Sequence, residues 1–151
     1  MEFRKATKAD LETITRITVD CETDEENLQY PNKTLSEIRK YCTAESFRRA
    51  LLRELKEKNM YFVVVEIDNN IIGFGQAILK KDVGEIGRIC IDRKYRKMGI
   101  GKELMKYLIR LLRKKKVKTI ESHCYTKNKP ALKMHEKLGF RKEAYKLSLE
   151  V

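Results

Sequence analysis

The 151-residue sequence contains no tryptophan, and no apolar stretch approaches the roughly 20 residues that a membrane-spanning helix requires. Its first residues lead into a polar segment and lack the apolar centre of a secretory signal. The four cysteines, at positions 21, 42, 90 and 124, include no C-x-x-C pair of the kind that binds zinc or exchanges disulfides. We therefore expect a cytoplasmic protein with reduced thiols, no metal site and no membrane partner.

Length and composition favour a single globular domain over residues 1–151. The chain is long enough for one hydrophobic core and too short for two ordinary domains. Lysine and glutamate are abundant while glutamine occurs only at positions 29 and 76, a balance found in proteins of thermophiles. The four cysteines and five methionines weaken the inference of such a source.

Charge is distributed unevenly along a chain whose formal net charge is +12. Residues 92–118 hold twelve basic side chains against two acidic ones, whereas residues 20–26 hold five carboxylates and no base. We expect the basic stretch to attract a polyanion and the acidic segment a cation. The basic run 113–116 suits the negative end of a helix dipole, and the stretch lacks the interleaved aromatic residues of a stacking platform. A nucleic-acid partner is therefore not expected.

Hydrophobic periodicity predicts an alternation of helices and strands. Cap residues and turn signals set the boundaries. The predicted strands cover residues 2–6, 61–67, 71–79, 85–91 and 117–125, with one or two closing strands after residue 140, and the predicted helices cover residues 8–20, 34–58 with a break near Thr43, 99–116 and 128–138. The strands at 61–67, 71–79 and 85–91 should form an antiparallel meander.

The most informative stretch is the R-K-M-G-I-G sequence at 96–101, which lies between a predicted strand and a predicted helix. Glycines there let the backbone bend and approach a ligand closely. The first amides of the following helix lack intrahelical acceptors and point partial positive charge outwards, which suits a phosphate. Arg96 and Lys102 add full charges. Glycine pairs also occur in simple tight turns, so both interpretations stay open on this stretch alone.

A second motif, N-x-x-A-x-x-M-H-x-x-x-G-F, follows at 128–140. The two motifs, about 30 residues apart and in this order, resemble the GNAT superfamily of acyl-CoA-dependent N-acetyltransferases, and the resemblance covers residues 71–140. It implies an α/β fold with a mixed, mostly antiparallel sheet of six to seven strands, splayed between strands 4 and 5 and covered by helices on both faces. It also implies direct transfer of an acetyl group from acetyl-CoA to a primary amine in a ternary complex.

The resemblance assigns residues to acetyl-CoA. Main-chain groups of Ile89 and Ile91 would bond the two amides of pantetheine, because a strand edge that has left its neighbour offers unused N–H and C=O groups. Asn128 matches a position that commonly supports the cofactor. The pyrophosphate would bind to the turn formed by Arg96, Lys97, Met98, Gly99, Ile100, Gly101 and Lys102.

Two residues are candidates for proton transfer. An attacking amine must lose its proton, and Glu85, at the start of the fourth strand, is the candidate base; an ordinary charged residue beside Lys80 is the alternative. His135 stands where the family usually has a tyrosine that protonates the leaving thiolate. Histidine can fill that role, or it can be a packed residue with His123 or Tyr125 as the acid.

The acceptor is expected to be a small cationic amine or a peptide. The acidic residues Glu22, Asp24, Glu25 and Glu26 would draw it in, unless they form only a solvated loop. Two other activities stay open: a protein N-terminal or lysine acetyltransferase, and an acetyl-CoA sensor without turnover. A homodimer is common among similar proteins.

Overall fold

The computed structural model describes residues 1–24 and 33–144. Their elements follow in chain order. They are β1 (Glu2–Lys5), a turn of 3-10 helix (Lys8–Asp10), α1 (Leu11–Glu22), α2 (Leu35–Thr43), α3 (Glu45–Glu54), β2 (Met60–Ile67), β3 (Asn70–Lys80), β4 (Val83–Ile91), a second 3-10 turn (Arg93–Tyr95), α4 (Ile100–Lys114), β5 (Thr119–Ser122) and α5 (Lys129–Lys137).

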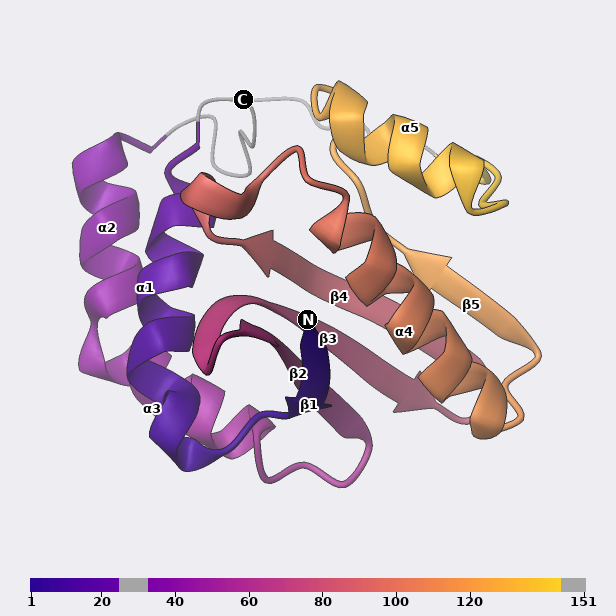
Figure 1. Ribbon diagram of the computed structural model, residues 1–151, viewed down its shortest axis with the longest axis horizontal. Coiled ribbons are helices and arrows are strands. Elements are labelled where there is room, and N and C mark those ends of the chain that lie inside the picture. The colour runs from indigo at the N-terminus through magenta and orange to yellow at the C-terminus, as the bar shows by residue number, and fades with distance from the viewer. Residues whose placement is uncertain (25–32, 145–151) are drawn as a thin grey trace, which may run out of the picture.

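The sheet has the strand order β1-β2-β3-β4-β5 (Figure 1). The first four strands pair antiparallel, and β5 pairs parallel to β4. This confirms the predicted mixed α/β fold and the central meander. The described residues contain five strands instead of six to seven: residues 140–144 form no strand, and the rest of the region predicted to hold the closing strands lies outside the described part of the chain.

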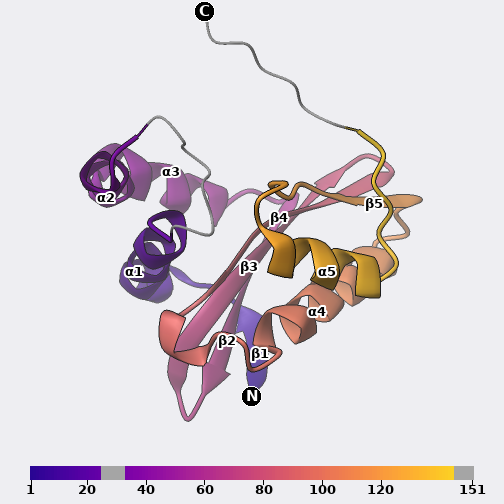
Figure 2. The same ribbon diagram turned by 90° about the horizontal axis from the view of Figure 1, so that it is seen from above.

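Helices cover both faces of the sheet, as predicted. Helices α1, α2 and α3 lie on one side, and α4 and α5 lie on the other (Figure 2). Alternate residues of β2 therefore enter two different cores: Val64 packs with α1 residues, whereas Val63 and Val65 pack with α4 residues. Burial on both faces explains why β2 is hydrophobic along almost its whole length.

Helix α4 packs closely on β3 and β4 through the predicted apolar stripe. Leu104, Leu108 and Leu112 are each fully buried. A Cβ added at Gly75 would lie 2.9 Å from Leu108 Cδ1, and one added at Gly84 would lie 2.8 Å from Leu112 Cδ1. These contacts show that glycines on the strands let the helix pack directly on the sheet.

The predicted helical region 34–58 is divided near Thr43, as expected. Helix α2 ends at Thr43, and α3 begins at Glu45 after its N-cap Ala44. The hydroxyl of Thr43 donates back to the Arg39 carbonyl (2.9 Å), so it is used inside α2 and does not cap α3. The first of these helices is capped as its sequence suggests: Thr34 accepts from the Glu37 amide (3.3 Å).

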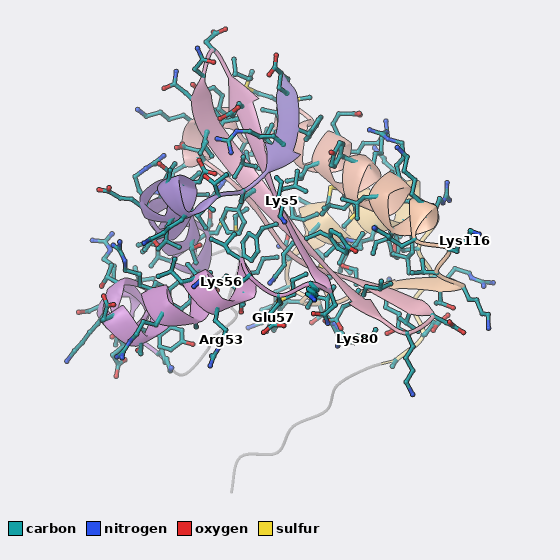
Figure 3. The ribbon with its side chains drawn as sticks, turned by 90° about the horizontal axis from the view of Figure 1, so that it is seen from below. Lys5, Arg53, Lys56, Glu57, Lys80 and Lys116 are labelled. Atoms are coloured by element: carbon teal, nitrogen blue, oxygen red, sulfur yellow. The ribbon has the colours of Figure 1, made fainter. Side chains whose placement is uncertain are left out.

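Basic side chains are spread over several elements. Figure 3 labels Lys5 on β1, Arg53 on α3, Lys56 after α3, Lys80 at the end of β3 and Lys116 after α4. Positive charge is thus not confined to residues 92–118.

Within the described ranges, no helix has the length and apolar character needed to cross a membrane.

Candidate active site

Strands β4 and β5 pair over only part of their length. The paired residues run from Val83 opposite Thr119 to Ile86 opposite Ser122. Strand β5 ends there, while β4 continues to Ile91. The remaining residues of β4 therefore present an edge with no strand partner from β5, which is the opening predicted between strands 4 and 5.

A β-bulge in β4 begins at the same level. Ile86 and Ile89 pair with Ala77 and Gly75 of β3, so β4 has one more residue than β3 between these pairs. An extra residue bends a strand and increases its twist. This bend accounts for the separation of β4 from β5. A Cβ at Gly87, inside the bulge, would lie 3.0 Å from the Gln76 side-chain oxygen, so glycine fits the tight approach there.

The glycine turn follows β4 and begins α4, as predicted. Gly99 is the N-cap of α4 and has φ +81°, a left-handed conformation that favours glycine. The amides of Lys102 and Glu103 both donate to the Gly99 carbonyl (3.0 and 3.2 Å). By helix geometry, the amides of Ile100 and Gly101 precede these bonds and point their partial positive charge beyond the helix.

The side chains of the turn differ in exposure. Ile100 is buried in the α4 core, Lys102 is half-buried, and Lys97 and Met98 are exposed. Lys97 also has a positive φ of 63°, so the turn contains two left-handed residues. Gly101 has ordinary backbone angles, and its role is spatial. A Cβ there would lie 3.7 Å from Ile91 and 4.0 Å from both Ile89 and Met134, and it would project between β4 and α5.

The guanidinium of Arg96 faces α1. Its Nε donates to the Ile91 carbonyl (3.0 Å), and one terminal nitrogen forms an ion pair with Asp24. The other terminal nitrogen donates to the Asp20 carbonyl (3.4 Å) and lies 3.7 Å from the Cys21 sulfur. The turn and the end of α1 are therefore joined by one side chain.

Helix α5 carries the second motif and lies against β5. His135 Nδ1 lies 2.7 Å from the Ala131 carbonyl, and its Nε2 lies 2.9 Å from the Ser122 hydroxyl. Ser122 is the last β5 residue that pairs with β4, so His135 sits where the strands separate. The ring also packs edge-on against Phe140, with centroids 5.3 Å apart. The Asn128 side chain caps α5 by accepting from the Ala131 amide (3.1 Å).

Because a carbonyl oxygen can only accept, His135 Nδ1 carries a proton. In the neutral ring Nε2 is then the acceptor, and the Ser122 hydroxyl donates to it. Sequence reasoning did not identify Ser122, since a serine in a short strand gives no signal until its partner is known. The pair is well placed to handle a proton beside the opening.

Glu85 lies in the paired part of β4, one residue before the bulge begins. Its neighbours Gly84 and Ile86 face α4, so the Glu85 side chain projects from the opposite face of the sheet. It is about 20% exposed, forms an ion pair with Lys80 and lies 3.9 Å from His123 Nδ1. Glu85 is thus half-buried and paired with a cation, on the side of the sheet that holds α1 and α3.

A polar cluster that sequence analysis did not identify occupies the same side. Arg88 pairs with Glu54 of α3 (3.2 Å), and the Gln76 amide donates to Glu54 (3.3 Å). Burial raises the pKa of Glu22 at the end of α1, and the nearby Arg88 charge only partly opposes this shift. Arg88 and Glu54 are 34 residues apart, so only the packing of α3 over β4 brings them together.

The predicted acidic segment is described only in part. Glu22 is the last residue of α1 and is half-buried, and Asp24 forms an ion pair with Arg96. Glu25 and Glu26 lie outside the described residues. Among the residues that the structure describes, no group of His, Cys, Asp and Glu has the arrangement of a metal site.

The four cysteines are free thiols, of which Cys21, Cys42 and Cys90 are buried. Cys21 hydrogen-bonds with Cys90, and this bond together with the charge of Arg96 lowers the pKa of Cys21. The same bond and complete burial raise the pKa of Cys90. Cys90 belongs to the core between α1 and the sheet, as expected for a packing residue, and Cys124 is half-buried.

Comparison with known proteins gives this geometry a context. A model of the acetyltransferase (GNAT) family matches residues 14–140. An uncharacterized N-acetyltransferase of Bacillus subtilis, the SPbeta prophage-derived YokL, is 32% identical over 107 residues, which cover 67% of this chain and 59% of that protein. The chain thus spans less than two thirds of the length of this relative.

Solved structures share the fold at low sequence identity. The PaiA N-acetyltransferase of Thermoplasma acidophilum, solved with coenzyme A, has a TM-score of 0.80 at 20% identity over 96% of this chain and 92% of that one. The acetyltransferase AAC(6')-Iy, solved with the bisubstrate analogue CoA-S-monomethyl-acetylneamine, has a TM-score of 0.73 at 17% identity over 99% and 97% of the two chains.

Proposed function

Since the chain belongs to the GNAT family of acetyltransferases, we propose that it moves an acetyl group from acetyl-CoA directly to a primary amine. The observation that carries this proposal is the opening beside β4, which adjoins the amides at the start of α4. One surface therefore offers strand groups for two amides and helix amides for a pyrophosphate.

The residues present fit acetyl-CoA as a substrate. The amides of Ile100 and Gly101 suit the pyrophosphate, with Lys97 and Lys102 as nearby cations. The β4 edge at Ile89 and Ile91 suits pantetheine, and Gly101 has no side chain to project between this edge and α5. A side chain at position 101 would occupy space beside this edge, which explains why glycine suits this position.

Glu85 is proposed as the base. It is half-buried on the sheet face opposite α4, and its negative charge favours a cationic amine. The ammonium form of the amine first gives one proton to Glu85, directly or through water. The neutral amine then forms a bond to the acetyl carbon as the carbon–sulfur bond breaks, and its nitrogen loses a second proton to water. The electron pair of the broken bond stays on sulfur as a thiolate.

His135 with Ser122 is proposed to return a proton to that thiolate. Only the protonated ring has a proton at Nε2 to give, and Ser122 can pass one on because its hydroxyl both donates and accepts. The hydrogen bond to the Ala131 carbonyl holds the ring in place throughout. His135 thus stands in for the tyrosine of similar proteins by a different route.

The acceptor is proposed to be a small cationic amine. Glu22 and Glu54 flank Arg88 on the same sheet face as Glu85, so the three carboxylates outnumber the two basic partners, Arg88 and Lys80, near the place of attack. AAC(6')-Iy was solved with an analogue that joins CoA to an acetylated aminoglycoside fragment, which makes amino sugars reasonable first candidates. Peptides with free amines form the second group.

The test is an acceptor screen. The protein is mixed with acetyl-CoA and single amines (polyamines, amino sugars and basic peptides), and the free thiol of CoA is measured. Thiol release that requires an amine supports the proposal, and a preference for peptides over every small amine would identify a protein acetyltransferase. Calorimetric binding of CoA without transfer to any member of the panel would overturn the proposal in favour of a sensor.

A further inference from the structure

Arg96 is the basic residue that precedes the glycine turn, but its side chain is already occupied. A guanidinium has five N–H donors in a fixed fork. The Ile91 carbonyl, the Asp24 carboxylate, the Asp20 carbonyl and the Cys21 sulfur each accept from it or lie in contact with it. Engaging a phosphate with both ends of the fork would require Arg96 to break several of these contacts.

The partners of Arg96 lie at the two segments that face each other across the site. Asp20, Cys21 and Asp24 belong to the end of α1 and the residues just after it, and Ile91 is the last residue of β4. The Asp20 carbonyl is among the last four of α1, which have no acceptor role inside the helix and carry partial negative charge. A cation there both caps the helix and ties it to the strand.

A second bridge runs in the opposite direction between the same segments. Arg16 of α1 donates to Asp92 (2.9 Å), the residue after β4. Asp92 is about 7% exposed, and its carboxylate also accepts from the Lys94 amide (3.1 Å). Each segment thus supplies one arginine and one aspartate to the other, and two crossed ion pairs hold the end of α1 against the segment that leads into the turn.

We propose that Arg96 is a positioning residue that braces the cofactor turn against the acceptor-side helix α1, and that it does not bind the pyrophosphate through its side chain. The inference rests on the proposed function for the ligand of the turn. It adds that α1 and the glycine turn are held together by these ion pairs, so a substitution on α1 or just after it alters acetyl-CoA binding at the turn.

The test compares two brace variants and one control variant, each with two ligands. Arg96→Gln and Asp24→Asn each remove one side of the ion pair, and Lys97→Gln removes a charge from the same turn as a matched control. CoA and S-acetylpantetheine, which lacks every phosphate, are titrated by calorimetry. We expect Arg96→Gln and Asp24→Asn each to weaken the binding of both ligands by about five- to tenfold. Lys97→Gln should weaken the binding of CoA only.

If Arg96 bound the phosphate directly, the variants would change the two ligand affinities in a different pattern. Arg96→Gln would then weaken CoA but not acetylpantetheine, and Asp24→Asn would leave CoA binding unchanged or strengthen it by releasing Arg96. Lysine is itself a good phosphate ligand but lacks the planar fork, so Arg96→Lys separates the two roles. Recovery of CoA affinity in Arg96→Lys would overturn the brace, and continued loss would support it.

Combining the two changes gives a further check. Because both remove the same ion pair, the double variant should bind CoA no more weakly than the single variants, whereas independent additive losses would overturn the proposal. If Arg96→Gln does not fold, Asp24→Asn with acetylpantetheine carries the test alone. These titrations need no turnover: absence of transfer to any amine, with the binding pattern intact, would refute the proposed reaction and not the brace.

Discussion

Replacing Gly99 and Gly101 singly by alanine separates the two reasons for glycine in the turn. Gly99 has φ +81°, and a Cβ there meets nothing within 4 Å, so alanine at this position suffers backbone strain alone. A non-glycine residue in the left-handed region costs about 1–2 kcal/mol. We expect Gly99→Ala to lower the free energy of unfolding by about that amount.

Gly101→Ala should behave differently. Its Cβ would make ordinary contacts with Ile91 (3.7 Å) and Met134 (4.0 Å), so the free protein accepts it. Alanine is favoured over glycine in a helix by up to about 1 kcal/mol, which makes the variant as stable as the parent or slightly more stable. The methyl group projects between β4 and α5, however, and we expect it to weaken CoA binding at least tenfold.

The assay pairs urea unfolding with calorimetric titration of CoA for the parent and both variants. We expect a lower free energy of unfolding in Gly99→Ala, and weaker CoA binding without lost stability in Gly101→Ala. Unchanged CoA affinity in Gly101→Ala would show that the ligand does not pass between β4 and α5. Unchanged stability in Gly99→Ala would refute the strain argument.

Three further predictions use other parts of the molecule. The Arg4 side chain lowers the pKa of Asp10 to about 2 from its ordinary value of 3.8, so the ion pair stabilises the fold above pH 4 and this contribution is lost as the pH falls through 2. Asp10→Asn should therefore lower the free energy of unfolding by on the order of 2 kcal/mol at neutral pH and reduce its dependence on acid pH in urea titrations. An unchanged acid dependence would contradict this role of the ion pair. Glu85→Gln should lower turnover at least tenfold with CoA affinity intact. Glu121→Gln, at the exposed position of β5 that pairs with Glu85, should leave turnover unchanged. Equal effects of the two variants in steady-state kinetics would show that Glu85 is not the base. Leu108→Ala, at a fully buried position of α4, should lower the free energy of unfolding by about 2–5 kcal/mol. A smaller loss would mean that neighbouring side chains move to fill the cavity.

Sequence patterns predicted the parts of the fold that depend on local periodicity. The apolar stripe of α4 and the meander from β2 to β4 follow from spacing and residue type, and the structure confirms them. The break near Thr43 is confirmed, but the N-cap of α3 is Ala44, and the Thr43 hydroxyl bonds back to the preceding turn of α2, an alternative that a cap signal cannot exclude.

The site was predictable only where the chain itself brings residues together. The Gly99 turn and the α5 motif are each contiguous, so their sequences carry the information. Contacts across the fold are different. The Arg96 bridge to Asp24 spans 72 residues, and the Ser122 bond to His135 depends on how α5 packs on β5. A basic residue before a glycine turn gave no indication that its side chain would face α1.

The most direct test of the central claim is a mass balance of the reaction by mass spectrometry and thiol assay, with acetyl-CoA and the best amine of the panel. We expect one acetylated amine to form for each CoA thiol released, and we expect release to stop without amine. Thiol release with no acetylated amine, or CoA bound with every amine unchanged, would contradict it.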